Sequence, residues 1–96
     1  MPYLIIAYDH PNMEEEREAV RQAHRDYLAA QGRQLLSSGA LLGEDGIEII
    51  GGASLIDKDS RDEAVRFEAE DPYSRAGIRA KVEICLLYTS PSPRDA

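Results

Sequence analysis

Hydrophobic residues follow two different spacings along the chain, and the changes between them predict the elements. Residues 3–8 form a short run of β-branched and aromatic side chains that ends in the turn formers of residues 9–12, which is typical of a first strand. From residue 13 to residue 31 the apolar positions recur every three or four residues, which predicts a helix. The chain therefore begins with a strand followed by a helix.

The predicted helix has a recognisable beginning, end and buried face. Three glutamates at residues 14–16 suit the positive N-terminal end of a helix, and Gly32 can supply the left-handed residue that stops it. The residues expected on its buried face are Val20, Ala23, Tyr27 and Leu28, and His24 lies within their arc. The residues expected on its solvated flanks and far side, without a function, are Arg17, Glu18, Arg25 and Asp26.

The middle of the chain predicts two strands joined by a hairpin. Residues 34–42 read as a second strand, and residues 43–46, with a glycine at each end, are a strong hairpin signal. A third strand follows over residues 47–56 and is interrupted at Gly51-Gly52. Paired glycines in a strand mark a bulge or a close approach of another backbone. We expect these two strands to pair antiparallel.

The last third of the chain predicts a second helix and a final strand. Ser60 and Glu63 form a capping box that opens the helix, and Pro72 disfavours helical backbone at Asp71. Residues 80–84 alternate polar and apolar side chains as a half-buried strand does. The resulting order is β-α-β-β-α-β, an α+β arrangement of the ferredoxin-like kind, in which two helices cover one face of a four-stranded antiparallel sheet.

The other face of this sheet has no helix to cover it. Apolar strands favour its burial by a second copy of the chain, and a domain of 96 residues gains needed stability from such burial. We therefore expect one domain that forms a homodimer.

Composition narrows the function classes. The chain is 43% hydrophobic and 30% charged, and no run of apolar residues approaches the ~18 that a membrane helix needs. A net charge of -7 without a basic stripe argues against nucleic acid as a partner. The single cysteine, Cys85, excludes an intrachain disulfide and a zinc site built on cysteines. The first residues lack the features of an export leader, so we expect a cytoplasmic protein without membrane contact.

Two motifs resemble the YciI-like (YCII-related) family. They are Arg21-x-x-His24 in the first helix and Asp71-Pro72-Tyr73-x-x-Ala76-Gly77 after the second, and the likeness extends over residues 1–84. The resemblance implies a dimeric α+β barrel of ferredoxin-like protomers, with His24 and Asp71 matching the family's proposed active-site residues. Kinship of that fold to small isomerases and lyases implies proton-transfer chemistry.

The two residues also suit that chemistry on physical grounds. Histidine moves protons near neutral pH, and a carboxylate on one ring nitrogen fixes its tautomer and raises its basicity. His24 and Asp71 can meet only if the two helices lie side by side. A lone histidine on an apolar helix face is otherwise a structural residue, and Asp71 is equally a turn former before Pro72.

Three further residues are candidates for contact with substrate. Arg21 can bind an anionic substrate, brace Asp71, or form a surface ion pair. Tyr73 can line the pocket, and Gly77 can permit a turn or a close backbone approach beside it. No metal ligand set is expected, because His10 lies in a loop without an identifiable partner.

Two functions follow from these residues. The first is a cofactor-independent lyase or isomerase that acts on a small metabolite in an apolar dimer pocket, with His24 as general acid and base and Asp71 positioning it. The second is a module that binds a small ligand or stabilises an assembly, in which the pair is a buried structural hydrogen bond.

The chain departs from the family at Cys85. Residues 85–96 resemble the translation of a transposase sequencing adapter, so we treat them as a tail foreign to the family. Its first residues can extend the last strand, whereas Ser90-Pro91-Ser92-Pro93 should be loose.

Overall fold

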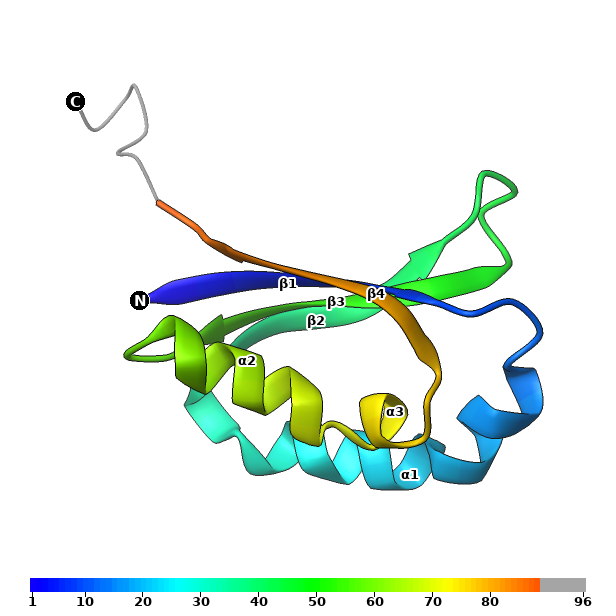
Figure 1. Ribbon diagram of the computed structural model, residues 1–96, viewed down its shortest axis with the longest axis horizontal. Helices are drawn as coiled ribbons and strands as arrows, with labels where there is room; N and C mark the ends of the chain where they lie inside the picture. Colours follow the sequence, from blue (N-terminus) through cyan, green and yellow to red (C-terminus); the bar gives the residue numbers. More distant parts are fainter. Residues whose placement is uncertain (89–96) are drawn as a thin grey trace.

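A computed structural model describes residues 1–88, which form a four-stranded sheet with all its helices on one side (Figure 1). The elements in chain order are β1 (Pro2–Asp9), α1 (Glu14–Ala30), the short 3-10 helix η1 (Gly32–Gln34), β2 (Leu35–Leu42), β3 (Ile49–Asp57), α2 (Arg61–Glu70), α3 (Pro72–Arg75) and β4 (Arg79–Leu86). The strand order is β2-β3-β1-β4, and every neighbouring pair is antiparallel. This arrangement confirms the predicted α+β, ferredoxin-like fold.

Strand β1 lies in the centre of the sheet and contributes most to the core. Its alternate side chains Tyr3, Ile5 and Ala7 are buried on the side of the helices. Tyr3 and Ile5 pack with Ile56 of β3 and with Phe67 of α2. Each fully buried large side chain of this kind stabilises a fold by about 1.5 to 3 kcal/mol, so the β1–α2 contact holds the helix layer on the sheet.

The buried face of α1 differs from the prediction in two places. Tyr27 and Leu28 pack against the core as expected, and Gly32 has the left-handed φ of 61° that ends the helix. Ala23 is exposed, and Arg17, predicted to be solvated, is only 7% exposed. The prediction for Arg17 was wrong because apolar spacing takes no account of a buried partner charge, which here is Asp9.

The Gly51-Gly52 pair allows two strands to approach closely. Strand β3 runs through both glycines without the predicted interruption, and both pair regularly with β1. A Cβ on Gly51 would overlap the backbone carbonyl oxygen of Ala7. The strand begins only at Ile49, two residues later than predicted. The Asp45 carboxylate accepts the backbone N–H groups of Ile47 and Glu48, which holds these two residues in the turn.

The junction between α2 and α3 sets the position of Asp71. The Ser60 hydroxyl accepts the backbone N–H of Glu63 at 3.2 Å, so the predicted cap is present, and α2 ends at Glu70. Asp71 then takes extended backbone angles (φ -60°, ψ 133°), as a residue before proline should, and its side chain caps the short helix α3. Helix α3 was not predicted.

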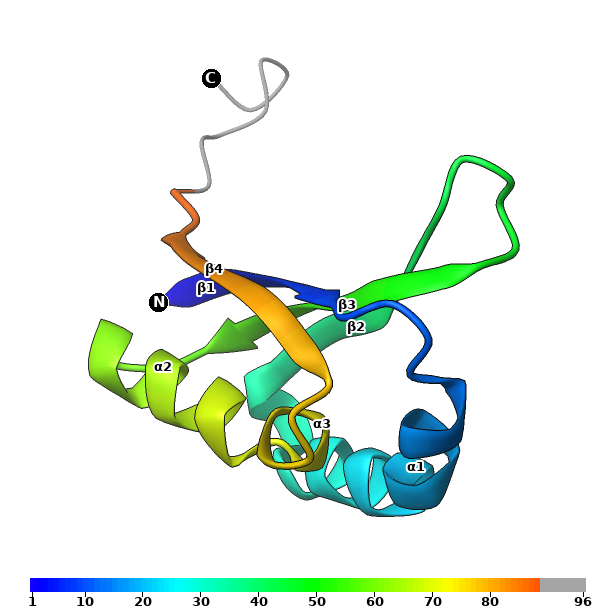
Figure 2. The same ribbon diagram turned by 45° about the vertical axis from the view of Figure 1, so that its right-hand side comes forward.

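The opposite face of the sheet is not covered by any described helix (Figure 2). By the alternation of side chains along a strand, this face carries Leu4, Ile6 and Tyr8 of β1 and Leu55, the partner of Leu4 in β3. Tyr8 is 39% exposed and the other three are half-buried. Within residues 1–88 no helix is long and apolar enough to cross a membrane.

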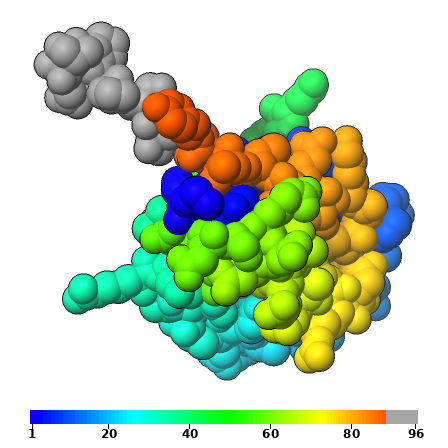
Figure 3. Space-filling view, turned by 60° about the vertical axis from the view of Figure 1, so that its left-hand side comes forward, coloured from blue at the N-terminus to red at the C-terminus, as the bar shows by residue number. Residues whose placement is uncertain are grey.

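The end of β4 lies beside the N-terminus (Figure 3). Tyr3 pairs with Leu86, and the backbone N–H of Leu87 donates to the carbonyl of Pro2 at 2.9 Å. The strand thus continues two residues beyond the predicted Ile84. The Ser-Pro-Ser-Pro segment expected to be loose lies outside the described residues.

Candidate functional site

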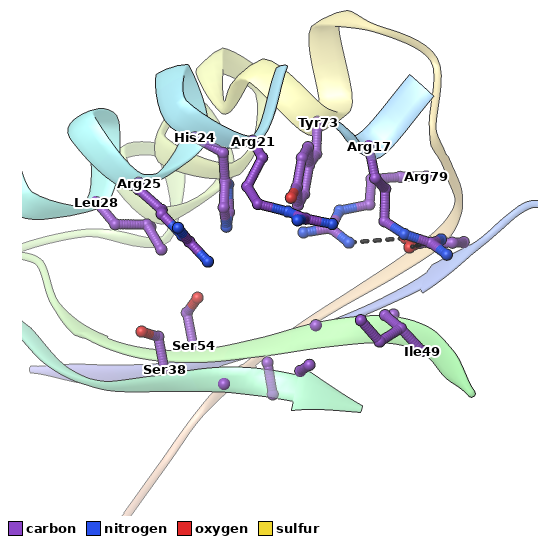
Figure 4. Close-up of a pocket in the computed structure, with 16 residues that line it drawn as sticks. Arg17, Arg21, His24, Arg25, Leu28, Ser38, Ile49, Ser54, Tyr73 and Arg79 are labelled. Carbon is purple, nitrogen blue, oxygen red and sulfur yellow. Dashed lines mark hydrogen bonds and ion pairs between the residues drawn. The ribbon is translucent and has the colours of Figure 1, made fainter. Parts of the chain in front are cut away.

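A cavity of about 490 Å³ lies between α1 and the strands β2 and β3 (Figure 4). Helix α1 forms its roof with His24 and three arginines, and Ser38 and Ser54 point up from the sheet below. Tyr73 of α3 and Arg79 of β4 close one end. These walls lie on the helix side of the sheet, and their lining is more polar than the apolar pocket that the sequence predicted.

His24 and Asp71 meet at this cavity. The Nδ1 atom of His24 lies 2.8 Å from Oδ1 of Asp71, and the two side chains are 16% and 3% exposed. An ionised carboxylate can only accept a hydrogen bond, so the neutral imidazole carries its proton on Nδ1. Its other nitrogen, Nε2, is then unprotonated and able to accept a proton from a molecule in the cavity.

The orientation of Asp71 follows from its place in the chain. Its Oδ1 atom also accepts the backbone N–H of Tyr73 at 2.8 Å, as the cap of α3. Pro72 occupies the first position of that helix, where the missing N–H costs nothing. The local Asp-Pro-Tyr sequence therefore orients the carboxylate of Asp71 independently of its contact with His24 of α1.

Tyr73 fixes the plane of the imidazole. The rings of Tyr73 and His24 are stacked, with centroids 3.9 Å apart and an angle of 9° between their planes. The guanidinium carbon of Arg79 lies 5.2 Å from the centre of the same tyrosine ring. Stacking of aromatic rings typically contributes about 0.5 to 1.5 kcal/mol beyond their burial, which is enough to favour one ring orientation.

A buried ion cluster at one end of the cavity was not predicted. Asp9 accepts Arg17 Nη1 on Oδ2 at 3.1 Å and Arg79 Nη1 on Oδ1 at 2.7 Å. The Asp9 side chain is only 2% exposed. The sequence contained one signal for it, since Asp9 continues the alternation of buried positions in β1. A carboxylate at a buried position requires a cationic partner, and the cluster supplies two.

Glu68 of α2 lies behind this cluster. Its Oε1 atom accepts the Ser74 hydroxyl at 3.1 Å and lies 3.5 Å from Nε of Arg79. Burial raises the pKa of Glu68, while the positive charge of Arg79 opposes the rise.

The structure brings together four of the five predicted site residues. His24 and Tyr73 line the cavity, Asp71 binds His24 from behind, and Arg21 lines the cavity while its Nη1 atom pairs with Glu18 at 2.6 Å. Gly77 is exposed and does not line the cavity. Its φ of 75° fits the predicted role in a turn.

Within residues 1–88 no three His, Cys, Asp or Glu side chains gather closely enough to hold a metal ion. His10, for which the sequence identified no partner, is exposed. The side chains that meet in the cavity are suited to proton transfer and to binding of negative charge.

Solved structures share this fold over nearly the whole chain. The solved structure of 5-chloro-2-hydroxyhydroquinone dehydrochlorinase (TftG) from Burkholderia phenoliruptrix AC1100, in complex with 2,5-dihydroxybenzoquinone, matches with a TM-score of 0.84 and 26% identity, covering 94% of this chain and 96% of that one. Rv0793 from Mycobacterium tuberculosis matches with a TM-score of 0.54 and 14% identity, covering 96% and 100%. Atu4242 from Agrobacterium tumefaciens matches with a TM-score of 0.53 and 16% identity, covering 97% and 98%. The last two show likeness of fold alone.

No curated protein matches the chain. A family model described as the YCII-related domain matches residues 1–87, which is most of the sequence and includes the His24 and Asp71 motifs. The chain therefore belongs to the YCII-related domain family.

Proposed function

We propose that the protein is a cofactor-independent lyase or isomerase in which His24 transfers protons to and from a small metabolite. The observation that carries the proposal is the 2.8 Å contact between His24 Nδ1 and Asp71 Oδ1 at the wall of a cavity. The carboxylate directs the basic lone pair of Nε2 toward bound substrate and stabilises the imidazolium that forms. Tyr73 and Asp71 are positioning residues, because they act through the imidazole.

The reaction begins when Nε2 takes a proton from a carbon next to a carbonyl group. The electron pair of the broken C–H bond moves toward the carbonyl oxygen and gives an enolate. In an isomerase, the imidazolium returns the proton to a different atom of the substrate. In a lyase, the leaving group departs with its bonding electrons as a new double bond forms, and the net loss is one proton and one anion.

The similarity to the dehydrochlorinase supports the lyase reading. That protein removes the elements of hydrogen chloride, as its name states, and its solved structure is a complex with a hydroxylated quinone. Both molecules named for it are small rings, and a cavity of about 490 Å³ lies within the range of about 300 to 1,000 Å³ usual for small-molecule sites.

A deuterium-exchange experiment tests the proton transfer without knowledge of the natural substrate. Each ring C–H carbon of 2,5-dihydroxybenzoquinone lies between a carbonyl carbon and an enol carbon, so it exchanges when a deuterated imidazolium adds a deuteron to the carbon and Nε2 then removes the original proton. The loss of the C–H signal in D2O can be followed by proton NMR. We expect wild type to accelerate the exchange and His24→Gln to reduce that acceleration by about 10²- to 10⁴-fold, the usual contribution of a general base. Arg33→Gln, a change of an exposed residue outside the cavity, is the control. Equal exchange rates in wild type, His24→Gln and buffer would refute the proposal.

One observation favours a second candidate function, a non-catalytic binding module. Asp71 Oδ1 accepts both His24 and the backbone of Tyr73, so the pair also ties α1 to α3. If the pair were structural only, Asp71→Asn would lower the melting temperature while ligand binding persisted and no exchange occurred in wild type.

The open face of the sheet supports a homodimer. Leu4, Ile6 and Leu55 are contiguous apolar side chains on a face without a helix, and a second copy can bury them. Light scattering on wild type should give the mass of two chains, and Ile6→Asp should give one. A monomeric wild type would exclude the dimer.

A further inference from the structure

The cavity collects positive charge in an acidic protein. The chain has a net charge of -7 and 11 lysines and arginines in all. Four of the arginines line this one cavity, namely Arg17, Arg21, Arg25 and Arg79, against one carboxylate, Asp9. Arginines scattered over a solvated surface would not gather in one cavity. Because like charges repel, their concentration here calls for partners of opposite charge.

Two of the four arginines have buried partners of opposite charge. Arg17 and Arg79 share Asp9, and Arg79 also lies near Glu68. Both guanidinium side chains are at most 9% exposed. Their charge is matched inside the fold, so this pair serves the structure of the cavity end.

The other two arginines are differently placed. Arg21 and Arg25 lie one turn apart on α1, on either side of His24 in the sequence, and both line the cavity. In Figure 4 both side chains extend from the helix toward the cavity beside the imidazole. Like charges four residues apart destabilise a helix, so helix stability does not explain the spacing.

The positive charges of Arg21 and Arg25 are also available to a ligand. The carboxylate that pairs with Arg21 belongs to Glu18, whose side chain is 68% exposed and outside the cavity lining. Arg25 makes no ion pair or side-chain hydrogen bond with any described residue. An exposed ion pair contributes little, typically ~0–1 kcal/mol, so a ligand can replace Glu18 at low cost.

We propose that Arg21 and Arg25 form an anion-binding subsite, and that the substrate is a small planar organic anion whose charged oxygens lie against these guanidiniums. The reactive carbon then lies beneath Nε2 of His24. The proton-transfer part of this assignment rests on the proposed function, whereas the binding part stands independently. A guanidinium presents a planar fork of donors that matches a carboxylate or a pair of neighbouring ring oxygens.

The same arrangement assists the chemistry proposed for His24. Removal of a proton next to a carbonyl places negative charge on the oxygen, and a fixed guanidinium nearby stabilises that oxygen more than the neutral carbonyl. Opposite the arginines, the hydroxyls of Ser38 and Ser54 offer further hydrogen bonds. Gly52 also lines the cavity, and a Cβ there would lie 3.2 Å from Nη2 of Arg79. An anionic ring lying between roof and floor would meet all of these groups.

Calorimetric titration of matched probes tests the subsite. Each pair contains an anion and a neutral ring of similar size: 2,5-dihydroxybenzoquinone, which is ionised at neutral pH, with hydroquinone, and benzoate with benzamide. We expect wild type to bind the anions more tightly. Arg25→Gln should weaken anion binding about 10- to 100-fold, the worth of one charged hydrogen-bonding group, and leave the neutral probes nearly unchanged. Arg33→Gln removes the same charge outside the cavity and should have little effect.

The outcomes separate the subsite from the proton transfer. His24→Gln should keep the anion preference while it loses deuterium exchange. If exchange is absent in wild type but the anion preference depends on Arg25, the subsite stands and the enzymatic proposal fails. The subsite is overturned if neither anion binds more tightly than its neutral partner, or if Arg21→Gln/Arg25→Gln retains the wild-type preference, whatever the exchange rate.

Discussion

Asp9→Asn should be among the most damaging single-atom changes in this protein. The substitution keeps the shape of the side chain but removes the negative charge that Arg17 and Arg79 share. Those two side chains are 8% and 9% exposed, so water cannot replace the lost partner. The amide nitrogen would also face a guanidinium donor, which leaves one of the two arginines without an acceptor.

The expected cost follows from the burial of the cluster. Removal of one partner from a buried ion pair costs about 3 to 5 kcal/mol, a large part of the ~5–15 kcal/mol that stabilises a typical domain. For a chain of this size each kcal/mol lowers the melting temperature by about 4 to 8 °C, so a loss of about 12 to 40 °C is expected. Circular dichroism during thermal and urea unfolding measures both quantities.

Glu18→Gln provides the matched control. It removes the same charge from an ion pair whose side chains are 39% and 68% exposed, for which ~0–1 kcal/mol is usual. The melting temperatures and urea midpoints of the two variants should therefore differ widely. Equal unfolding midpoints for Asp9→Asn and Glu18→Gln would show that burial does not determine the worth of these charges.

Three further predictions concern backbone packing and pH. Gly51→Ala should destabilise the sheet by about 1 to 3 kcal/mol or more, because its methyl group meets a carbonyl of β1, whereas Gly39→Ala, with no atom within 4 Å of the new Cβ, should be nearly neutral in urea unfolding. Burial raises the pKa of Tyr27 from 10.0 to about 12, so the stabilisation from its neutral hydroxyl, which donates to Phe67, is full below pH 10 and is lost as pH rises through 12. The free energy of unfolding of wild type relative to Tyr27→Phe should therefore fall over that interval, and a constant difference would contradict it. Burial raises the pKa of Glu68, so its contribution is greatest at low pH and is lost as pH rises through that pKa. Glu68→Gln should thus gain stability relative to wild type between acidic and neutral pH, and parallel urea midpoints would exclude this.

The fold could be predicted from the sequence because its signals are local. Alternation in residues 3–8, the glycine that ends α1 and the cap at Ser60 each depend on neighbouring residues, and each is present in the structure. The pairing of His24 with Asp71 was predicted from two family motifs together with the topology. Physical patterns alone left both residues with structural alternatives.

The charged half of the cavity could not be predicted in the same way. Arg17 lies on α1 at a position that apolar spacing assigns to solvent, and only the three-dimensional arrangement places it against Asp9. Arg25 is exposed as predicted, and its place in the lining of the cavity likewise depends on that arrangement. A buried charge is stable only with its partner, and that partner lies on another element. Periodicity describes one element at a time, so it cannot reveal such a pair.

The position of the cavity on the helix side of the sheet has a practical consequence. Successive side chains of β1 point to opposite sides, so Tyr3, Ile5 and Ala7 support the cavity layer while Leu4 and Ile6 do not. Substitutions at the outward residues can therefore alter the proposed dimer contact while the inward residues that support the cavity stay as they are. The sheet separates the two faces, so each can be redesigned without changing the side chains of the other.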